Sequence, residues 1–115
     1  MNIQLTAKKI EIPSDVREEA KEKFARLVKF NPRIQSVEVV VEAEERRIGC
    51  EAIIRLDSHD SIVIEVYADT IQGAVDVAIV KCERQLRKTK ERDSARRRAN
   101  KNDRVRDGGE DLAEV

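Results

Sequence analysis

Three consecutive runs of alternating apolar and polar residues, all between residues 37 and 68, constrain the fold of this chain most strongly. The first run places Val37, Val39, Val41 and Ala43 at every second position, and the runs over residues 48–56 and 62–68 repeat the pattern. A period of two puts alternate side chains on opposite faces of a β-strand. Because one face of each run is apolar and the other is mixed, we predict a sheet that is covered on one side only.

Two segments with helical periodicity flank these strands and can supply that cover. The first segment follows Pro13, with Ser14 or a neighbour as the N-cap, and ends at Asn31-Pro32 because the residue before proline avoids the α region. Its apolar stripe comprises Val16, Ala20, Phe24, Leu27 and Val28. The second segment is predicted to begin with a capping box of Asp69 and Gln72. Its stripe comprises Ile71, Ala74, Val75, Ala78, Ile79, Cys82 and Leu86.

The alternating residues 3–6 at the start of the chain add a fourth strand, so the expected order is β-α-β-β-β-α. We predict an α+β fold in which two helices pack on one face of a four-stranded, mostly antiparallel sheet. A β-α-β start requires that the first two strands be parallel. The 115 residues suffice for one domain, which we place at residues 1–91, followed by a flexible tail, basic and then acidic, at residues 92–115.

Nothing in the sequence indicates catalysis or a bound cofactor. The single histidine, His59, falls in a predicted turn, and Cys50 and Cys82 fall on predicted core faces as small buried thiols. We find no metal-ligand spacing, no glycine-rich loop before a helix and no paired carboxylates set apart from cations. The chain has no signal peptide and no membrane-spanning run. We therefore expect a cytoplasmic protein that is not an enzyme and has no metal, cofactor, small-molecule substrate or membrane partner.

The charges are balanced overall but unevenly distributed. Residues 1–80 contain 11 Lys and Arg against 15 Asp and Glu, whereas residues 81–115 contain 12 against 8. In the last helix the predicted outer face carries a row of Lys81, Arg84, Lys88 and Arg92, with Arg87 beside it. The first helix adds Lys23, Arg26 and Lys29, and the tail adds Arg96, Arg97 and Arg98. Because aromatic residues make up only 3% of the chain, we expect contacts with RNA phosphates and not base stacking.

The segment DTIQGAVDVAIVKCERQLRKTKE, residues 69–91, resembles the C-terminal signature of the bacterial ribosome hibernation promoting factor and ribosome-associated inhibitor A (protein Y) family, short form. The segments IEIPSDVREEAKEKFARLVKF and SVEVVVE are similar to the first helix and second strand of that family. The resemblance implies binding to 16S-type rRNA in the decoding channel of the small subunit, which would block mRNA and tRNA and silence translation in stationary phase or stress. The RNA-facing residues that it implies are Lys23, Arg26, Lys81, Arg84, Lys88 and Lys90. With Arg87 and Arg92 they complete the predicted interface of the domain.

Several alternatives stay open from the sequence. The step Ser94-Ala95-Arg96-Arg97-Arg98-Ala99 is similar to the tail of protein Y, which implies inactivation of single ribosomes by a protein that is a monomer when free. A short hibernation factor that promotes ribosome dimers with a partner is the first alternative. A protein-interaction module that modulates a sigma factor is the second, and generic binding of duplex RNA is the third.

Overall fold

The computed structural model describes residues 2–102, with the side chains of residues 2–92. In chain order the elements are β1 (Asn2–Lys8), α1 (Ser14–Ala25), a 3₁₀ turn η1 (Arg26–Lys29), β2 (Ile34–Ala43), β3 (Ile48–Leu56), β4 (Ser61–Ala68) and α2 (Ile71–Asn102). This order confirms the predicted β-α-β-β-β-α arrangement. The first helix tightens into η1 before it reaches the predicted end at Asn31-Pro32.

The four strands form one mixed sheet in the order β1-β2-β3-β4. The pair β1–β2 is parallel, with Leu5 opposite Val39, and the other two pairs are antiparallel, with Val39 opposite Ala52 and Ala52 opposite Ile64. All four of these residues point toward the core and are buried. The alternating pattern therefore predicted which face of each strand is covered.

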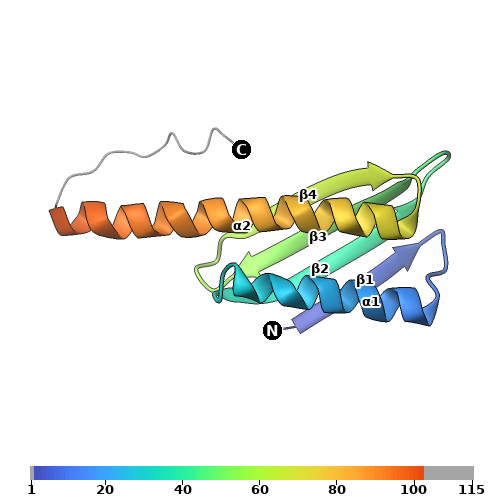
Figure 1. Cartoon of the computed structure of the whole chain (residues 1–115), viewed down its shortest axis with the longest axis horizontal. Coiled ribbons are helices and arrows are strands. Elements are labelled where there is room, and N and C mark those ends of the chain that lie inside the picture. Colours follow the sequence, from blue (N-terminus) through green and yellow to red (C-terminus); the bar gives the residue numbers. More distant parts are fainter. Residues whose placement is uncertain (1, 103–115) are drawn as a thin grey trace.

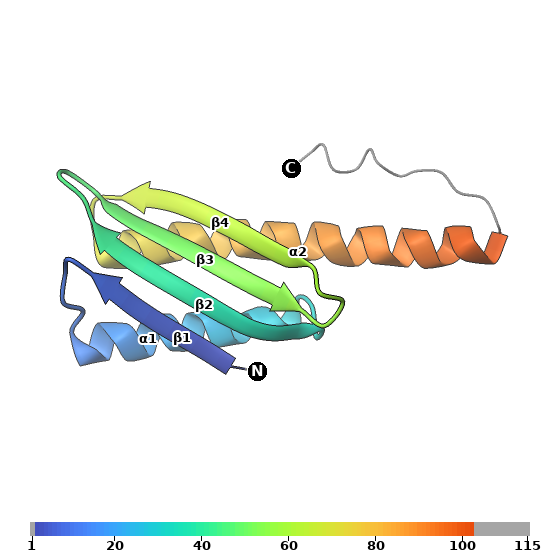
Figure 2. The same ribbon diagram turned by 180° about the vertical axis from the view of Figure 1, so that it is seen from behind.

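Both helices lie on the same face of the sheet, as Figure 1 shows. Figure 2, from behind, shows the other face uncovered. The core between the layers takes Phe24 and Leu27 from the first helical segment, Val39 and Ile54 from the sheet, and Leu86 from α2, each at most 1% exposed. The two amphipathic stripes found in the sequence thus meet the apolar face of the sheet, as predicted. Val28 is the exception in the first stripe: it lies in η1, where the chain has left α-helical geometry, and it is 38% exposed.

The start of α2 differs from the predicted capping box. The helix begins at Ile71, and the Thr70 hydroxyl accepts a hydrogen bond from the Gly73 N–H at 2.9 Å. Thr70 is therefore the N-cap, one residue after the predicted Asp69. At the start of α1, Pro13 occupies the N-cap position, which agrees with the prediction of Ser14 or a neighbour, and no side chain caps the helix. Ser14 is the first residue of the helix itself.

Helix α2 also extends to Asn102, beyond the predicted boundary at residue 91. Figure 1 shows its last turns running past the end of the sheet. Apolar periodicity was a poor guide here, because a helix that leaves the domain has no core to face and needs no apolar stripe. The predicted acidic end of the tail lies outside the described residues.

Candidate nucleic-acid interface

The cations of α2 lie on its solvent side because the apolar stripe fixes the rotation of the helix. Ala74, Ala78 and Leu86 are fully buried against the sheet, which turns the opposite side of the helix outward. The cations exposed on this helix are Lys81, Arg84, Arg87, Lys88 and Lys90. Arg92 is partly buried, and its Nη2 lies 3.9 Å from Oδ2 of Asp60 in the β3–β4 turn.

These cations form one row and two flanking positions. At 100° per residue, Lys81, Arg84 and Lys88 stay within one sector of the helix, whereas Arg87 turns toward α1 and Lys90 turns further still. Between residues 81 and 92 there are six cations and two acids, Glu83 and Glu91, which leaves a net charge of +4. In the described part of the chain, Lys81 and Arg84 form no ion pair, so their charges are available to an anionic partner.

Lys23 lies at the contact between the two helices. Its Nζ lies 2.6 Å from Oδ1 of Asp76 on α2 and 3.8 Å from Oε2 of Glu19 one turn earlier. The hydrogen bond with Asp76 raises the pKa of the Lys23 ammonium, and burial opposes this rise. The predicted neighbourhood of the helices is therefore present, but two carboxylates already meet the charge of Lys23. Arg26 and Lys29, which follow on η1, are exposed.

Arg87 makes the second contact between the helical segments. The centre of its guanidinium lies over the Phe30 ring, 5.0 Å from the ring centroid. Phe30 follows η1 directly and is partly exposed. Neither this stack nor the Lys23–Asp76 pair was predicted, because both join residues more than 50 positions apart; the only local signal was the position of Arg87 beside the row.

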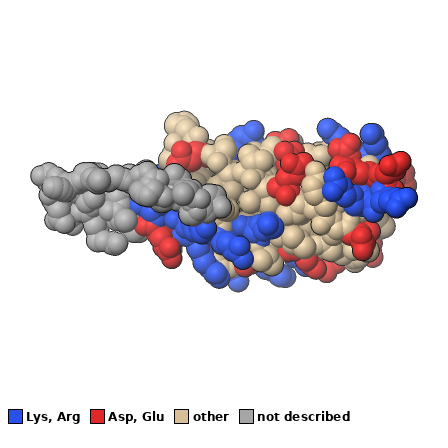
Figure 3. Space-filling view, turned by 90° about the horizontal axis from the view of Figure 1, so that it is seen from above, with Lys and Arg blue, Asp and Glu red and all other residues tan. Residues whose placement is uncertain are grey.

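The open face of the sheet carries more carboxylates than cations, and its cations include Lys8 and Arg55. Glu38 and Glu42 on β2, Glu51 on β3 and Glu65 on β4 all lie on the open face of the sheet, and Glu51 and Glu65 are direct cross-strand partners. Figure 3 shows Lys and Arg gathered beside the grey segment, near the point where α2 leaves the sheet, and mixed charges at the other end. The basic surface is thus local to α2, and an anionic partner would approach the helix layer.

Part of the predicted footprint lies on the extension of α2. Arg96, Arg97 and Arg98 are on helical backbone, but their side chains lie outside the described residues. Their predicted role as additional RNA contacts stays a prediction.

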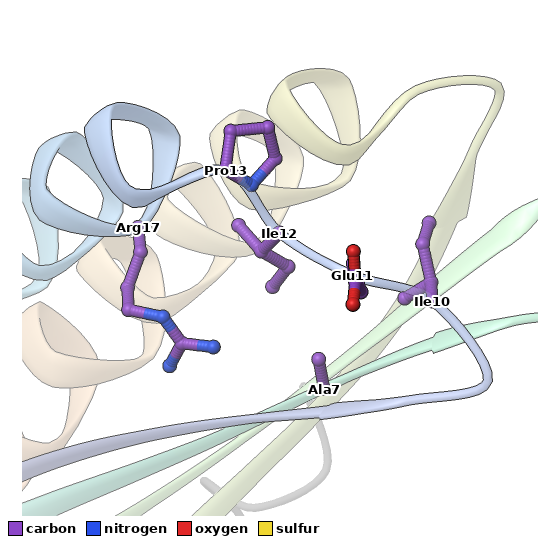
Figure 4. Close-up of a pocket in the computed structure, with 6 residues that line it drawn as sticks. All are labelled: Ala7, Ile10, Glu11, Ile12, Pro13 and Arg17. Carbon is purple, nitrogen blue, oxygen red and sulfur yellow. The ribbon is translucent and has the colours of Figure 1, made fainter.

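A hollow lies at the connection between β1 and α1, away from the cations of α2. Its volume is about 520 Å³. It is lined by Ala7, Ile10, Glu11, Ile12, Pro13 and Arg17 (Figure 4). The Arg17 guanidinium donates a hydrogen bond of 2.8 Å to the Leu5 carbonyl oxygen, so it fastens the helix to the edge strand. The lining has one carboxylate, that of Glu11, and the Arg17 guanidinium, which is already hydrogen-bonded. It therefore lacks a nucleophilic side chain next to a general base.

The other residues weighed in the sequence occupy the predicted positions. His59 is exposed in the β3–β4 turn with a φ of 74°, and both cysteines are buried and free. Among residues 2–92, no group of three or more His, Cys, Asp or Glu is arranged to hold a metal ion. No helix in the described part of the chain is long and apolar enough to cross a membrane.

Comparison with known proteins gives consistent matches over the folded part of the chain. The model of the family described as "Sigma 54 modulation protein / S30EA ribosomal protein" matches residues 3–94. Ribosome hibernation promoting factors from Pseudomonas putida and Azotobacter vinelandii are 25% and 26% identical over 92 residues. Each alignment covers 80% of this chain, with 89% of the first relative and 85% of the second.

Two solved structures have the same fold. A ribosomal subunit interface protein from Coxiella burnetii superposes with a TM-score of 0.73 at 24% identity, over 79% of this chain and 99% of that one. The N-terminal domain of Thermus thermophilus Protein Y gives a TM-score of 0.69 at 23% identity, over 77% and 99%. Both likenesses confirm the α+β architecture with two helices on a four-stranded mixed sheet.

Proposed function

This chain belongs to the Sigma 54 modulation protein / S30EA ribosomal protein family, which includes ribosome hibernation factors, and from that premise we propose that it binds the small ribosomal subunit and silences translation. The site we propose is the outer face of α2, acting on the phosphates of 16S-type rRNA. Arg26 and Lys29 extend it on η1. The cytoplasm, where ribosomes work, would be the location of the protein.

The observation that carries this proposal is the set of exposed cations between Lys81 and Lys90 on the helix layer. Lys81 and Arg84 form no ion pair in the described part of the chain, so phosphates need not displace an internal carboxylate to reach them. Phosphate contacts position a protein without reading sequence, so the shape of the rRNA would supply specificity. Lys23 contributes less, because Asp76 and Glu19 already meet its charge.

We propose that silencing works by occupancy. A domain bound in the decoding channel would fill the space that mRNA and tRNA need, and no chemical step is required. Relatives named as hibernation promoting factors support this mechanism. Inactivation of single ribosomes is the outcome we expect.

The direct test reverses three cations of the row, in the variant Lys81→Glu/Arg84→Glu/Lys88→Glu. Cosedimentation with purified small subunits should be lost, while the circular dichroism spectrum and melting temperature stay close to those of the original chain, because all three side chains are exposed. The original chain should also lose affinity steeply as salt rises, since each phosphate contact releases condensed counterions, with a slope on the order of 0.7–0.9 per contact.

The matched control reverses three exposed cations elsewhere, in Lys8→Glu/Lys9→Glu/Arg46→Glu, which changes the net charge by the same amount. This control should retain most of the binding. Equal binding by both triple variants would refute the α2 site. Retention of the chain by a protein after nuclease treatment, with little salt dependence, would instead favour the sigma-factor role that the family description mentions. A sucrose gradient of whole ribosomes separates single-ribosome inactivation from pairing.

A further inference from the structure

Two arginine side chains stack on aromatic rings in this molecule, and their surroundings differ. The guanidinium of Arg47 lies 3.7 Å from the centroid of the Tyr67 ring at the open face of the sheet. The guanidinium of Arg87 lies 5.0 Å from the centroid of the Phe30 ring between α2 and the end of η1. A guanidinium plane held against a ring has a second face that can stack on another planar group.

Carboxylates occupy the first of these stacks. Arg47 Nε lies 2.9 Å from Oε1 of Glu44, and the Tyr67 hydroxyl donates a hydrogen bond of 3.0 Å to Oε2 of Glu65. The pair therefore joins the β2–β3 turn to β4 in acidic surroundings. Such a site repels a polyanion, and its polar atoms are already bonded.

The stack of Arg87 on Phe30 differs from that of Arg47 on Tyr67 in both respects. In the described part of the chain no acidic side chain forms an ion pair with Arg87, although Glu83 and Glu91 lie one helical turn to either side. Its other neighbours along the helix are the exposed cations Arg84, Lys88 and Lys90. The partly exposed Phe30 ring holds the Arg87 side chain against η1, so a ligand that stacks on it does not have to order a free arginine.

We propose that Arg87, backed by Phe30, is a stacking site for one unpaired RNA base at the seam between α2 and η1. This inference rests on the proposed RNA-binding function and adds a base contact to the phosphate contacts. The cations along α2 hold the backbone, and a base turned out of the RNA fold lies on the free face of the Arg87 guanidinium. Unstacked bases are bound in this way by aromatic rings and arginine planes.

The inference changes what determines specificity. The Lys81–Arg84–Lys88 row accepts any RNA whose phosphates follow the helix, whereas a stacking site requires an unpaired base at a set distance from that backbone. A regular RNA duplex offers no such base. Binding to the small subunit should therefore include a contribution that does not depend on salt and that a duplex of equal charge does not provide.

The test compares Arg87→Lys with Arg84→Lys, each titrated on purified small subunits over a range of KCl concentrations. Both substitutions keep the charge and remove a guanidinium, but only Arg87 stacks on a ring. Arg87→Lys should weaken binding about tenfold more than Arg84→Lys does, a loss typical of one stacked base. The slope of affinity against salt should stay the same, because the number of cations is unchanged.

Substitutions of Phe30 separate stacking from a structural role. Phe30→Leu removes the ring but keeps the apolar contact, and it should reproduce the loss seen with Arg87→Lys; the double variant should show little further loss. Phe30→Tyr keeps the ring and should therefore keep most of the affinity of the original chain for small subunits. Melting temperatures identify any variant that fails through unfolding.

Equal affinities of Arg87→Lys and Arg84→Lys would overturn the stacking site and leave the proposed function intact. Failure of the original chain to bind small subunits at low salt would refute the proposed function itself. A loss that appears equally with a blunt-ended RNA duplex of two complementary strands would also overturn the inference, because such a duplex offers no unpaired base.

Discussion

The thiols of Cys50 on β3 and Cys82 on α2 lie in the core where the helix covers the sheet, and both are at most 1% exposed. Burial raises the pKa of the Cys50 thiol to about 11. Burial, followed by the nearby Cys50 and Glu83, raises the pKa of the Cys82 thiol to about 12. The reactive species is the thiolate, so both residues should be chemically inert in the folded protein.

We predict that Ellman's reagent labels neither thiol of the native protein at pH 8 and labels both in guanidinium chloride. The sign of the pH dependence follows from the same shifts. Because the folded-state pKa values are raised, the neutral thiols add stability that is complete below the unfolded value of about 8.5 and is lost as pH rises through about 11 and 12. Denaturant midpoints measured from pH 7 to pH 11 should therefore fall. Rapid labelling of the native protein would contradict the buried placement, and Cys50→Ala serves to assign the Cys82 signal.

Single residues also show which features of the site could be predicted from the sequence and which could not. The exposure of Lys81 and Arg84 follows from helical periodicity alone and was predicted. The engagement of Lys23 with Asp76 was not, because only the packing of α1 beside α2 brings residues so far apart in the chain within 2.6 Å. The stack of Arg87 on Phe30 depends on the same packing.

Among the helices and strands, the start of α2 allows a prediction about which residue caps the helix. The Thr70 hydroxyl accepts a hydrogen bond from the Gly73 N–H, and the Asp69 side chain forms no such bond in the described structure. A Cβ atom at Gly73 would lie 2.9 Å from Oγ1 of Thr70, so the tight cap also explains why glycine suits this position. Thr70→Val should lower the free energy of unfolding by roughly 0.5–2 kcal/mol, because it removes the hydroxyl and keeps the shape of the side chain.

Asp69→Asn is the matched control, since Asp69 is the cap that the sequence motif predicted. Chemical denaturation should show a change well below that of Thr70→Val. If Asp69→Asn lowered the free energy of unfolding more than Thr70→Val, Asp69 would be the N-cap of α2.

The elements themselves were largely predictable from sequence, because alternation and helical periodicity reflect which side chains are buried. Val39 and Ala52 face each other in the core as the pattern requires. What the pattern did not contain is the tightening of the chain at Arg26–Lys29 and the extension of α2 to Asn102. Both depend on local backbone geometry and not on burial, so periodicity carries no signal for them.

At the scale of the whole molecule, the formal charge of zero hides two unlike layers. The open face of the sheet has four carboxylates, on β2, β3 and β4, against Lys8 and Arg55, and Arg55 pairs with Glu38 at 3.4 Å. The cations of α2 lie on the opposite side. A polyanion would therefore orient the protein before contact, with the helix layer first. The extension of α2 past the sheet adds Arg96, Arg97 and Arg98 to the sequence of this helix.

The extension should matter for binding and not for folding. Among residues 2–92, the last fully buried side chain of the core is Leu86, and Figure 2 shows α2 continuing past the sheet that it covers. A chain ended after Arg92 should therefore keep its free energy of unfolding within about 0.5 kcal/mol, the range of surface changes. Compared with a chain ended after Asn102, its affinity for small subunits should fall at low salt, with a shallower salt slope, because the segment 93–102 holds four cations, at residues 96–98 and 101, against one carboxylate at residue 93.

Three lengths separate these effects: the full chain, a chain ended after Asn102 and one ended after Arg92. Ending after Asn102 removes five carboxylates, at residues 103, 107, 110, 111 and 114, and two arginines, at residues 104 and 106. Because the removed segment has a net charge of −3, its loss should strengthen binding to phosphate relative to the full chain. A chain ended after Gln85 loses the buried Leu86 and should unfold, because truncation of a buried leucine alone costs about 2–5 kcal/mol. If ending after Arg92 destabilised the domain as much, the folded unit would extend along α2, and the boundary predicted near residue 91 would be wrong.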